Sequence, residues 1–216
     1  MSVRKSSSIT LADIAAECGV RDLRVLEAVR AVERELFVPP ELAGDAGSDS
    51  PIRIGHGQTT SQPSLIAAML AATRPEAGDV ALEVGTGYGY QTALLARLVS
   101  FVWSIERLPD LAAVARANLA TSGTANVEVV TGDGTLGLPE HAPFDVIVVS
   151  AAFPEVPEPL ADQLAAGGRL VQPVGPSGAE EVNLYTKRRG RLQLEGLVTY
   201  ASFVPLIGTH AYRSAR

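Results

Sequence analysis

Three glycines at alternate positions form the motif with the clearest chemical meaning in this sequence. Gly85, Gly87 and Gly89 follow Glu83 at the end of a short apolar run, and a helix is expected to begin directly after them at Tyr90. Glycine permits positive φ angles and lets a ligand approach the backbone closely. The free N–H groups and positive dipole end of a following helix attract polar ligand groups. The motif therefore predicts a ligand site, with a plain tight turn as the simpler alternative.

A carboxylate at the end of the next predicted strand has a suitable spacing to reach the same ligand. Glu106 follows the apolar run 101–105 and comes 21 residues after Gly85. A carboxylate at this spacing can accept two hydrogen bonds from a ribose diol. The alternative is a surface glutamate that pairs with Arg107, but the spacing favours a ligand contact.

A third motif, Gly132-Asp133-Gly134, follows the predicted strand 127–131. An aspartate between glycines can hold an adenine amino group, although Asp-Gly turns are common in their own right. Ligands of doubly wound sheets bind beyond the carboxyl ends of the strands, so the three motifs predict a single site. The GxGxG spacing is typical of methyltransferases, whereas dinucleotide enzymes use GxGxxG to hold a pyrophosphate. The sequence therefore predicts S-adenosyl-L-methionine as the cofactor and S-adenosyl-L-homocysteine as the product.

Alternating strands and helices place these motifs at one edge of a sheet. They predict a doubly wound, Rossmann-like α/β fold with mostly parallel strands and helices on both faces. An antiparallel hairpin is expected after it, around Arg189-Gly190. We expect strands at 80–84, 101–105, 127–131, 145–150, 169–174, 181–187 and 192–199, and helices at 63–73, 90–99, 109–120 and 157–166.

The residues before this sheet are expected to form a helical segment. Thr10 and Asp13 suit a capping box, and Asp22 suits the N-cap of a second helix that continues until Pro39. The inward face of the first helix is expected to carry Leu11, Ile14, Ala15 and Cys18.

Composition argues against several classes of partner. The 216-residue chain has a formal net charge of −6, whereas a duplex-binding protein normally carries a basic face. The basic run 187–191 suits an exposed hairpin tip, so no nucleic-acid partner is expected. No apolar run approaches the roughly 20 residues of a membrane span, and the polar residues 1–8 do not resemble a signal peptide. We expect a cytoplasmic protein with no membrane partner.

Cysteine and histidine usage predicts neither a disulfide nor a metal site. Cys18 is the single cysteine, and His56, His141 and His210 are widely separated, without neighbouring ligands at metal-binding spacing.

The most specific pattern in the chain is the loop Gly55-His-Gly-Gln-Thr-Thr-Ser-Gln-Pro63. It lies within 52–63, a stretch of glycines and polar side chains that follows an expected exposed connection at 41–51. Together with the glycine motif, this loop resembles the protein-L-isoaspartate O-methyltransferase family, and the resemblance covers nearly the whole chain. Further matching segments are 19–29, 35–39, 104–107, 132–134, 144–147, 151–157, 167–170, 173–175 and 203–206, the last of which is similar to the family's closing strand.

The resemblance implies an enzyme that repairs damaged proteins. It would methylate the free α-carboxylate of an L-isoaspartyl residue, and the ester would then collapse to a succinimide. The division expected within one domain, 1–216, is N-terminal helices and substrate loop at 1–75, cofactor-binding core at 76–175 and C-terminal strands at 176–216. The candidate cofactor residues are Gln58, Glu83, Gly85, Thr86, Gly87, Gly89, Glu106, Arg107, Gly132, Asp133 and Gly134.

Ser61 and Thr59 are the expected catalytic residues. A free α-carboxyl has a pKa of roughly 3.5 and is ionised at neutral pH, so no strong general base is needed. Hydroxyls can donate to this carboxylate without neutralising it as a lysine would, but they could instead cap the helix that starts at Pro63. The candidate substrate residues are Thr60, His56, Phe203 and Val204. His56 could equally close over the cofactor or bridge loop backbones, and the apolar 203–206 segment could be core.

Two positions depart from the family pattern. Family members commonly carry an apolar residue where Thr60 stands and an aromatic residue or histidine where Ser64 stands. Both flank the presumed substrate mouth and bear on peptide preference. Two alternatives therefore stay open: an aspartyl methyltransferase acting on a dedicated precursor peptide, and a cofactor-binding adaptor without turnover. We expect isoaspartyl-containing proteins as partners; the oligomeric state is open, with a monomer favoured.

Overall fold

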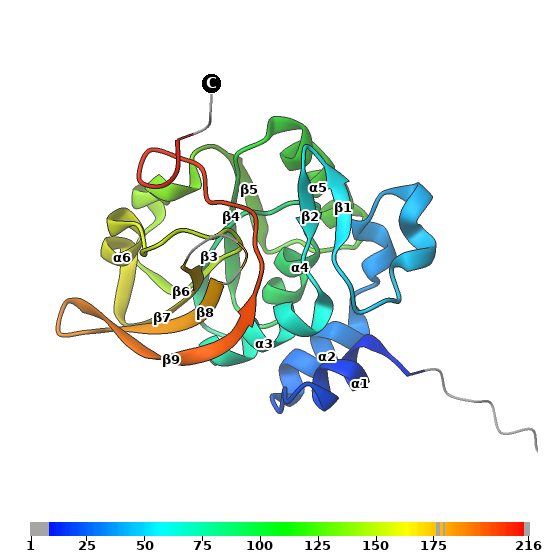
Figure 1. Ribbon diagram of the computed structural model, residues 1–216, viewed down its shortest axis with the longest axis horizontal. Coiled ribbons are helices and arrows are strands. Elements are labelled where there is room, and N and C mark those ends of the chain that lie inside the picture. The colour runs from blue at the N-terminus through cyan, green and yellow to red at the C-terminus, as the bar shows by residue number, and fades with distance from the viewer. Residues whose placement is uncertain (1–8, 176–177, 179, 214–216) are drawn as a thin grey trace, which may run out of the picture.

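The computed structural model describes residues 9–175, 178 and 180–213, and a seven-stranded sheet forms its centre (Figure 1). The strand order is β5-β4-β3-β6-β7-β8-β9. The pairings from β5 to β7 are parallel, and β7, β8 and β9 pair antiparallel. The predicted α/β fold is confirmed. The strands are β3 (Val80–Val84), β4 (Phe101–Glu106), β5 (Val127–Thr131), β6 (Phe144–Val149), β7 (Leu164–Val174), β8 (Glu180–Arg188) and β9 (Arg191–Ala201).

The strand order reverses between β3 and β6. From β3 the chain first adds β4 and β5 on one side, and then crosses to add β6 on the other. In register, Val84 of β3 lies beside Ile105 of β4 and Val149 of β6. Loops that leave neighbouring strands in opposite directions open a crevice at such a point, and ligands of doubly wound sheets bind there.

Helices cover the two faces of the sheet unequally. Val102 and Val146 belong to a buried cluster with Met69 of α3 (Pro63–Thr73) and Leu94 of α4 (Tyr90–Ala96), and α5 (Pro109–Thr121) extends this layer. The opposite face is covered by α6 (Glu158–Gln163) and by the short 3-10 turns η3 (Gly134–Leu136) and η4 (Pro139–His141). The fuller helical layer fixes the loops that lead into α3 and α4.

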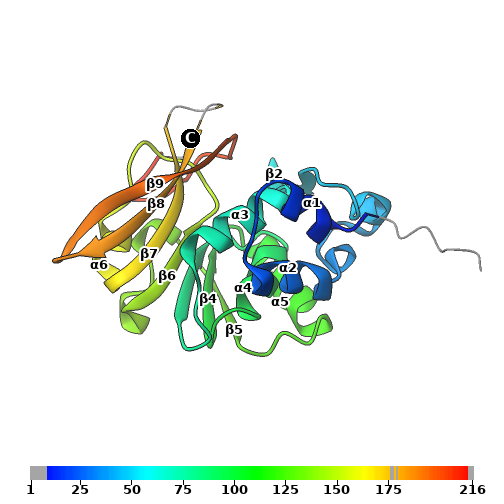
Figure 2. The same ribbon diagram turned by 90° about the horizontal axis from the view of Figure 1, so that it is seen from below.

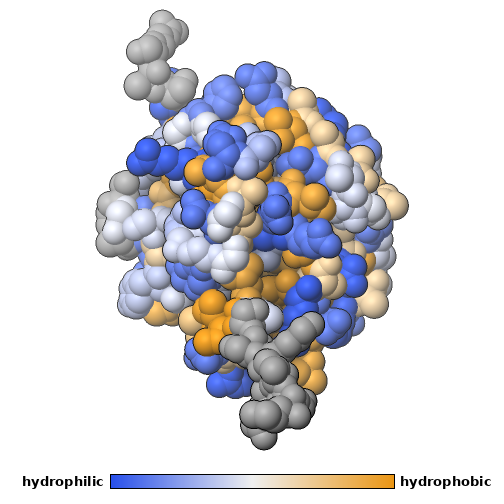
Figure 3. Space-filling model, turned by 90° about the vertical axis from the view of Figure 1, so that its right-hand side faces the viewer, coloured by the Kyte–Doolittle hydropathy of each residue, from blue (hydrophilic) through white to orange (hydrophobic). Residues whose placement is uncertain are grey.

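Two further helices lie outside α3 and α4. The helices α1 (Leu11–Glu17) and α2 (Leu23–Ala31) contact α3 and lie beyond it from the strands (Figure 2). The Thr10–Asp13 capping box and the Asp22 N-cap are both present, as predicted. On this side of the molecule hydrophilic and hydrophobic residues are interspersed (Figure 3). No helix among the described residues is long and apolar enough to cross a membrane.

The region before α3 differs from the prediction. The second helix ends at Ala31 because Val32 is extended, and two 3-10 turns, η1 (Arg34–Phe37) and η2 (Pro40–Asp45), replace its second half and part of the expected connection. Cys18 is exposed. The segment 52–63 is a hairpin rather than a loop, with β1 (Ile52–Gly55) and β2 (Gln58–Thr60) antiparallel. Burial of Ile52 and Ile54 on one face stabilises this strand, a signal that the flanking polar residues obscured.

The C-terminal third also departs locally from the prediction. The helix expected at 157–166 stops at Gln163, because Leu164 turns extended and pairs with Phe144. The helix expected at 90–99 ends at Ala96. The segment 203–206 is not a strand of the sheet. It is extended chain that bonds the backbone of Ala152, which lies just after β6. The polar run 1–8 lies outside the described residues.

Candidate active site

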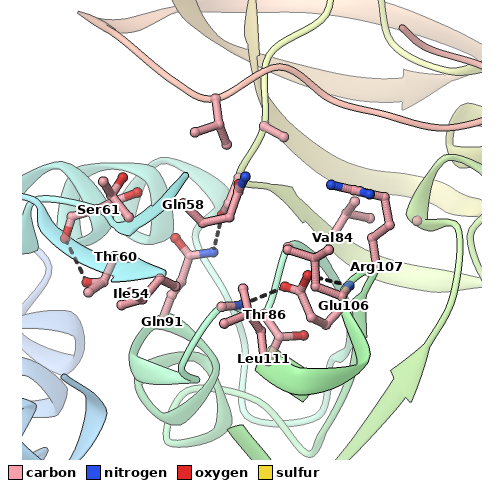
Figure 4. Close-up of a pocket in the computed structure, with 18 of the residues that line it drawn as sticks. Ile54, Gln58, Thr60, Ser61, Val84, Thr86, Gln91, Glu106, Arg107 and Leu111 are labelled. Carbon is pink, nitrogen blue, oxygen red and sulfur yellow. Dashed lines mark hydrogen bonds between the residues drawn. The ribbon is translucent and has the colours of Figure 1, made fainter. Parts of the chain in front are cut away.

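A cavity of about 890 Å³, which includes its open mouth, lies at the carboxyl ends of β3, β4 and β6. Its walls come from the glycine loop, the end of β4, the β1–β2 hairpin and the C-terminal segment at 204–207. Figure 4 shows Glu106 and Arg107 on one side of it, and Gln91, Thr60 and Ser61 on the other. The predicted cofactor residues that line it are Gln58, Gly85, Thr86, Gly87, Glu106, Arg107 and Gly134.

The glycine loop requires the conformations that glycine allows. Gly85, Gly87 and Gly89 have φ angles of +97°, +56° and +94°. A Cβ on Gly85 would lie 3.4 Å from the Ser150 Cβ, so the loop after β3 runs close to the residue after β6. Gly87 similarly approaches Ile54 of the hairpin, where a Cβ would lie 3.1 Å from Cδ1. The close approaches bring the hairpin and the end of β6 to the cavity.

Glu106 ties the glycine loop to the end of β4. Its side chain is only 7% exposed. Its Oε2 accepts the Gly87 N–H at 2.9 Å, and its Oε1 accepts the Leu108 N–H at 3.0 Å. Each carboxylate oxygen has a second lone pair, so both oxygens can still accept a hydroxyl from the cavity. This geometry suits the diol contact expected from the sequence.

Glu83, which was predicted to bind the cofactor, lies behind the cavity and does not line it. Its fully buried carboxylate accepts from Gln91 Nε2 at 3.0 Å, Thr92 Oγ1 at 2.5 Å and Ser104 Oγ at 2.6 Å. Burial raises the pKa of Glu83 to about 7, and the three donors oppose that rise. Glu83 can act on a ligand only through its neighbours, because β3 directs it into the core. Gly89 likewise does not line the cavity but faces Leu119.

The Asp133 carboxylate, expected to bind adenine, accepts hydrogen bonds from within the protein and does not line the cavity. Its Oδ1 accepts from the Thr135 N–H at 2.9 Å, and its Oδ2 accepts from the Thr209 N–H at 2.7 Å. Partial burial acts to raise the pKa of Asp133, but the hydrogen bonds from Thr135 and Thr209 outweigh it and hold the pKa below its usual value. Only Gly134 of its motif lines the cavity. The extended C-terminal segment crosses the strand ends here, which no local pattern indicated.

The substrate loop lies where the cavity meets a second groove. Gln58 and Thr60 line the cavity, and Thr59 and Ser61 line both the cavity and the groove. The groove encloses about 1150 Å³, open solvent included, and runs between the start of α3 and the chain from 198 to 204. The residues common to both spaces are Thr59, Ser61, Ser150 and Val204. Phe203 lines the groove but not the cavity.

His56 lies away from the groove, so the structure does not support its predicted contact with substrate. It occupies the hairpin turn with a φ of +51°, and its Nε2 is 3.5 Å from the Asp110 carboxylate at the start of α5. Its backbone oxygen accepts from Gln58 Nε2 at 3.2 Å. The hairpin tip therefore reaches over the cofactor side of the cavity.

Asp49, and not Thr59 or Ser61, accepts a backbone hydrogen bond at the start of α3, where Gln62 is the N-cap residue. Asp49 Oδ1 accepts the Ser64 N–H at 2.8 Å, and Oδ2 accepts Ser64 Oγ at 2.8 Å. Within the described part of the chain, neither the Thr59 nor the Ser61 hydroxyl has a hydrogen-bond partner. Both are available to a ligand. Ser64, the departure from the family pattern, adds the second of these hydrogen bonds through its hydroxyl.

Buried Arg34 organises the same region, and the sequence did not indicate it. Its guanidinium donates to the carbonyls of Ser48 at 2.7 Å, Ser50 at 2.8 Å and Ser61 at 3.4 Å. The side chain is 3% exposed and lies over the Tyr90 ring. In an amphipathic helix, which the sequence predicts here, a charged residue is expected to be exposed to solvent. Only the tertiary contacts of Arg34 reveal its role. Ser150, in contrast, could have been found from its place at a strand end.

Among the described residues, no three or more histidine, cysteine, aspartate or glutamate side chains are arranged to hold a metal ion.

Comparisons with known proteins identify the family. The model of the family described as protein-L-isoaspartate(D-aspartate) O-methyltransferase matches residues 7–211. A protein-L-isoaspartate O-methyltransferase of Methanoculleus marisnigri is 51% identical over 195 residues, covering 90% of this chain and 88% of that protein. One from Anaeromyxobacter dehalogenans is 51% identical over 199 residues, covering 91% of this chain and 95% of that protein.

Solved structures agree in fold. One protein-L-isoaspartate O-methyltransferase superposes with a TM-score of 0.81 at 29% identity, over 93% of this chain and 66% of that one. A protein of the same description from Plasmodium falciparum, solved in complex with S-adenosyl-L-homocysteine, gives 0.78 at 24% identity, over 91% of this chain and 96% of that one. The matched family model spans the glycine loop, Glu106 and the hairpin alike. This chain therefore belongs to the protein-L-isoaspartate O-methyltransferase family.

Proposed function

We propose that this protein transfers the methyl group of S-adenosyl-L-methionine to the free α-carboxylate of L-isoaspartyl residues in damaged proteins, the first step of repair through a succinimide. The observation that carries the proposal is the junction of two spaces at Thr59, Ser61, Ser150 and Val204. A cofactor in the cavity and a peptide in the groove would meet there. Family membership supplies the acceptor class.

The cavity fits the proposed cofactor in its chemistry. Glu106 offers two oxygens with free lone pairs to a ribose diol. Gly85 and Gly87 leave room for a ligand beside the backbone. Apolar side chains supply surfaces for a base, and they are Val84, Ile105, Leu108, Leu111 and Leu206. When bound, the cofactor supplies an electrophilic methyl group on a sulfonium and leaves as a neutral thioether.

The groove suits a carboxylate nucleophile. None of the described residues that line it is charged. An isoaspartyl α-carboxylate is already ionised at neutral pH, so it needs orientation rather than a base. The hydroxyls of Thr59 and Ser61 would donate to it without forming an ion pair that lowers its nucleophilicity. Alignment in a site of low water content is where most of the rate enhancement would arise, because charge is neutralised as the methyl group moves.

The groove walls also bear on which peptides bind. Thr60 is 8% exposed and lines the cavity, and Ser64 is tied to Asp49. With neutral walls, contacts to peptide backbone rather than to particular charged side chains would dominate. A repair enzyme has to accept many sequences, and such a groove fits that need.

The cellular location, oligomeric state and partners of the protein are part of the same proposal. We propose that the protein acts in the cytoplasm, as a monomer, on isoaspartyl-containing proteins and not on nucleic acid. The net charge of −6 supports the last point, because phosphate binding requires a basic face.

The test is transfer of a tritiated methyl group from labelled S-adenosyl-L-methionine to a peptide that contains L-isoaspartate. The matched control is the same peptide with ordinary aspartate. We expect label in the isoaspartyl peptide alone, as a base-labile ester. Equal labelling of both peptides would indicate an aspartyl methyltransferase. Cofactor binding by calorimetry with no labelling of either peptide would indicate a non-catalytic adaptor.

A further inference from the structure

Ser150 stands at the point where the strand order reverses, and no role has been assigned to it. It follows β6 directly, and its backbone N–H donates to the Val84 carbonyl at 2.9 Å. Its Cβ lies against Gly85 of the glycine loop. The half-buried Ser150 lines the cavity and the groove. Two sides of the site thus meet at a residue whose backbone is held by the sheet.

The hydrogen bonds of Gln91 leave the Ser150 hydroxyl hydrogen without an acceptor in this cluster. Gln91 Nε2 donates one hydrogen to Glu83 Oε1 at 3.0 Å and the other to Ser150 Oγ at 2.8 Å. The amide nitrogen faces Glu83 Oε1, because an amide oxygen there would oppose an oxygen of the ionised carboxylate. Ser150 Oγ is therefore an acceptor in this contact, and its own hydrogen remains to be donated elsewhere.

Buried polar groups behind Gln91 hold this arrangement. Glu83 is fixed by Thr92 and Ser104 as well as by Gln91, and all of these side chains are at least nine-tenths buried. Within the described residues the Ser150 hydroxyl donates to no protein acceptor, and the adjoining open spaces are the cavity and the groove. A neutral hydroxyl donor oriented toward the junction suits an anionic acceptor group.

On the basis of the function proposed above, we propose that Ser150 is a third hydroxyl, beside Thr59 and Ser61, that hydrogen-bonds the α-carboxylate of the isoaspartyl substrate. Gln91 and Glu83 act as positioning residues that keep its hydrogen directed toward the junction. Donation from two sides to one oxygen of the carboxylate leaves the other oxygen to form the new bond to the methyl carbon as the carbon–sulfur bond breaks. The products are a neutral ester and a neutral thioether.

The test separates substrate binding from cofactor binding. Ser150→Ala is expected to lower kcat/KM for the isoaspartyl peptide by about tenfold or more, which is the usual effect of losing a hydrogen bond to a charged group. The affinity for S-adenosyl-L-homocysteine, measured by calorimetry without peptide, should stay within about twofold. Ser150→Thr keeps the hydroxyl and should recover most of the activity. Ser122→Ala, at the far end of α5, is the matched control and should behave as wild type.

Two further variants test the shared carboxylate and the positioning role. Ser61→Ala combined with Ser150→Ala should be non-additive, because both hydroxyls bind one group. Gln91→Met leaves the Ser150 hydroxyl in place but removes the hydrogen bond that orients it. The fall in kcat/KM should therefore be smaller than in Ser150→Ala. Cooperative thermal unfolding of the variant is the check on folding.

Specific results would overturn the inference. If Ser150→Ala lowered the affinity for S-adenosyl-L-homocysteine by as large a factor as kcat/KM, the hydroxyl would be assigned to the cofactor. If Ser150→Ala left kcat/KM unchanged, or if its effect were strictly additive with that of Ser61→Ala, Ser150 would not bind the substrate carboxylate. Wild-type protein that labels no isoaspartyl peptide would instead refute the proposed function, and the two failures are thereby distinct.

Discussion

Replacing Glu83 by glutamine should change how the stability of this protein depends on pH. The Glu83 carboxylate is fully buried, and burial raises its pKa from 4.5 to about 7. In the unfolded chain the carboxyl ionises at its ordinary pKa, so the unfolded state loses its proton first as the pH rises. The stabilising contribution of the protonated side chain is complete below about pH 4.5 and is lost as the pH rises through about 7.

The size of the effect follows from the separation of the two pKa values. Each unit of separation corresponds to about 1.4 kcal/mol. Between pH 4 and pH 8 the wild-type protein should therefore lose about 3 kcal/mol of unfolding free energy through Glu83. Glu83→Gln keeps an acceptor for Gln91 and can donate to Thr92 and Ser104, so it removes the ionisation with little change of shape.

The measurement is urea unfolding of both proteins at several pH values, followed by far-UV circular dichroism and by fluorescence of the single tryptophan, Trp103. The difference in unfolding free energy between variant and wild type cancels the other titrating groups. We expect Glu83→Gln to gain about 3 kcal/mol relative to wild type from pH 4 to pH 8. Glu128→Gln, an exposed change on β5, is the control. A Glu83→Gln difference that stays constant across this range would refute the assigned ionisation.

Three other changes test the cavity, the fold and the substrate loop. Glu106→Ala should weaken S-adenosyl-L-homocysteine binding by at least about tenfold in calorimetry, because two acceptors are lost and the glycine loop is released; an unchanged affinity would exclude the diol contact. Gly137→Ala should lower the unfolding free energy by roughly 1–3 kcal/mol in urea, because φ is +63° and the added Cβ would overlap the Gln163 amide. Arg34→Met should cost at least about 2 kcal/mol in the same assay and raise KM for the isoaspartyl peptide, since four backbone carbonyls, among them those of Ala46 and Ser61, lose their donor. A KM that stays at the wild-type value would separate Arg34 from the substrate loop.

Local patterns predicted the sheet and the cofactor side of the site well. The helices α3 and α5 and the strands β3 to β6 follow from apolar runs bounded by proline and glycine, and they were located to within about two residues. Glu106 lines the cavity as expected because a strand end is a local feature. The errors cluster where a pattern was short. The hairpin at 52–60 has only two buried isoleucines to mark it, and the end of α6 depends on pairing with β6.

The groove could not be predicted in the same way. Its walls combine the start of α3 with the chain at 198–204, which lies more than a hundred residues later. The hydrogen bond from the Thr209 N–H to Asp133 likewise joins segments that are far apart in the sequence. The bonds from Arg34 to the carbonyls of Ala46, Ser48, Ser50 and Ser61 also lie beyond the reach of a local sequence pattern.

The sequence by itself determined the strand–helix alternation, the glycine loop and the position of Glu106 after β4, because each depends on residues that are neighbours along the chain. It also contained the hydroxyls of Thr59 and Ser61. The tertiary structure alone decided which of these groups meet. In the folded protein Glu83 and Asp133 do not line the cavity, whereas Ser150 lies at the junction of the cavity and the groove. The physical reason is that hydrogen-bond partners in a folded chain are set by packing across the sheet, and spacing in the sequence does not encode that packing.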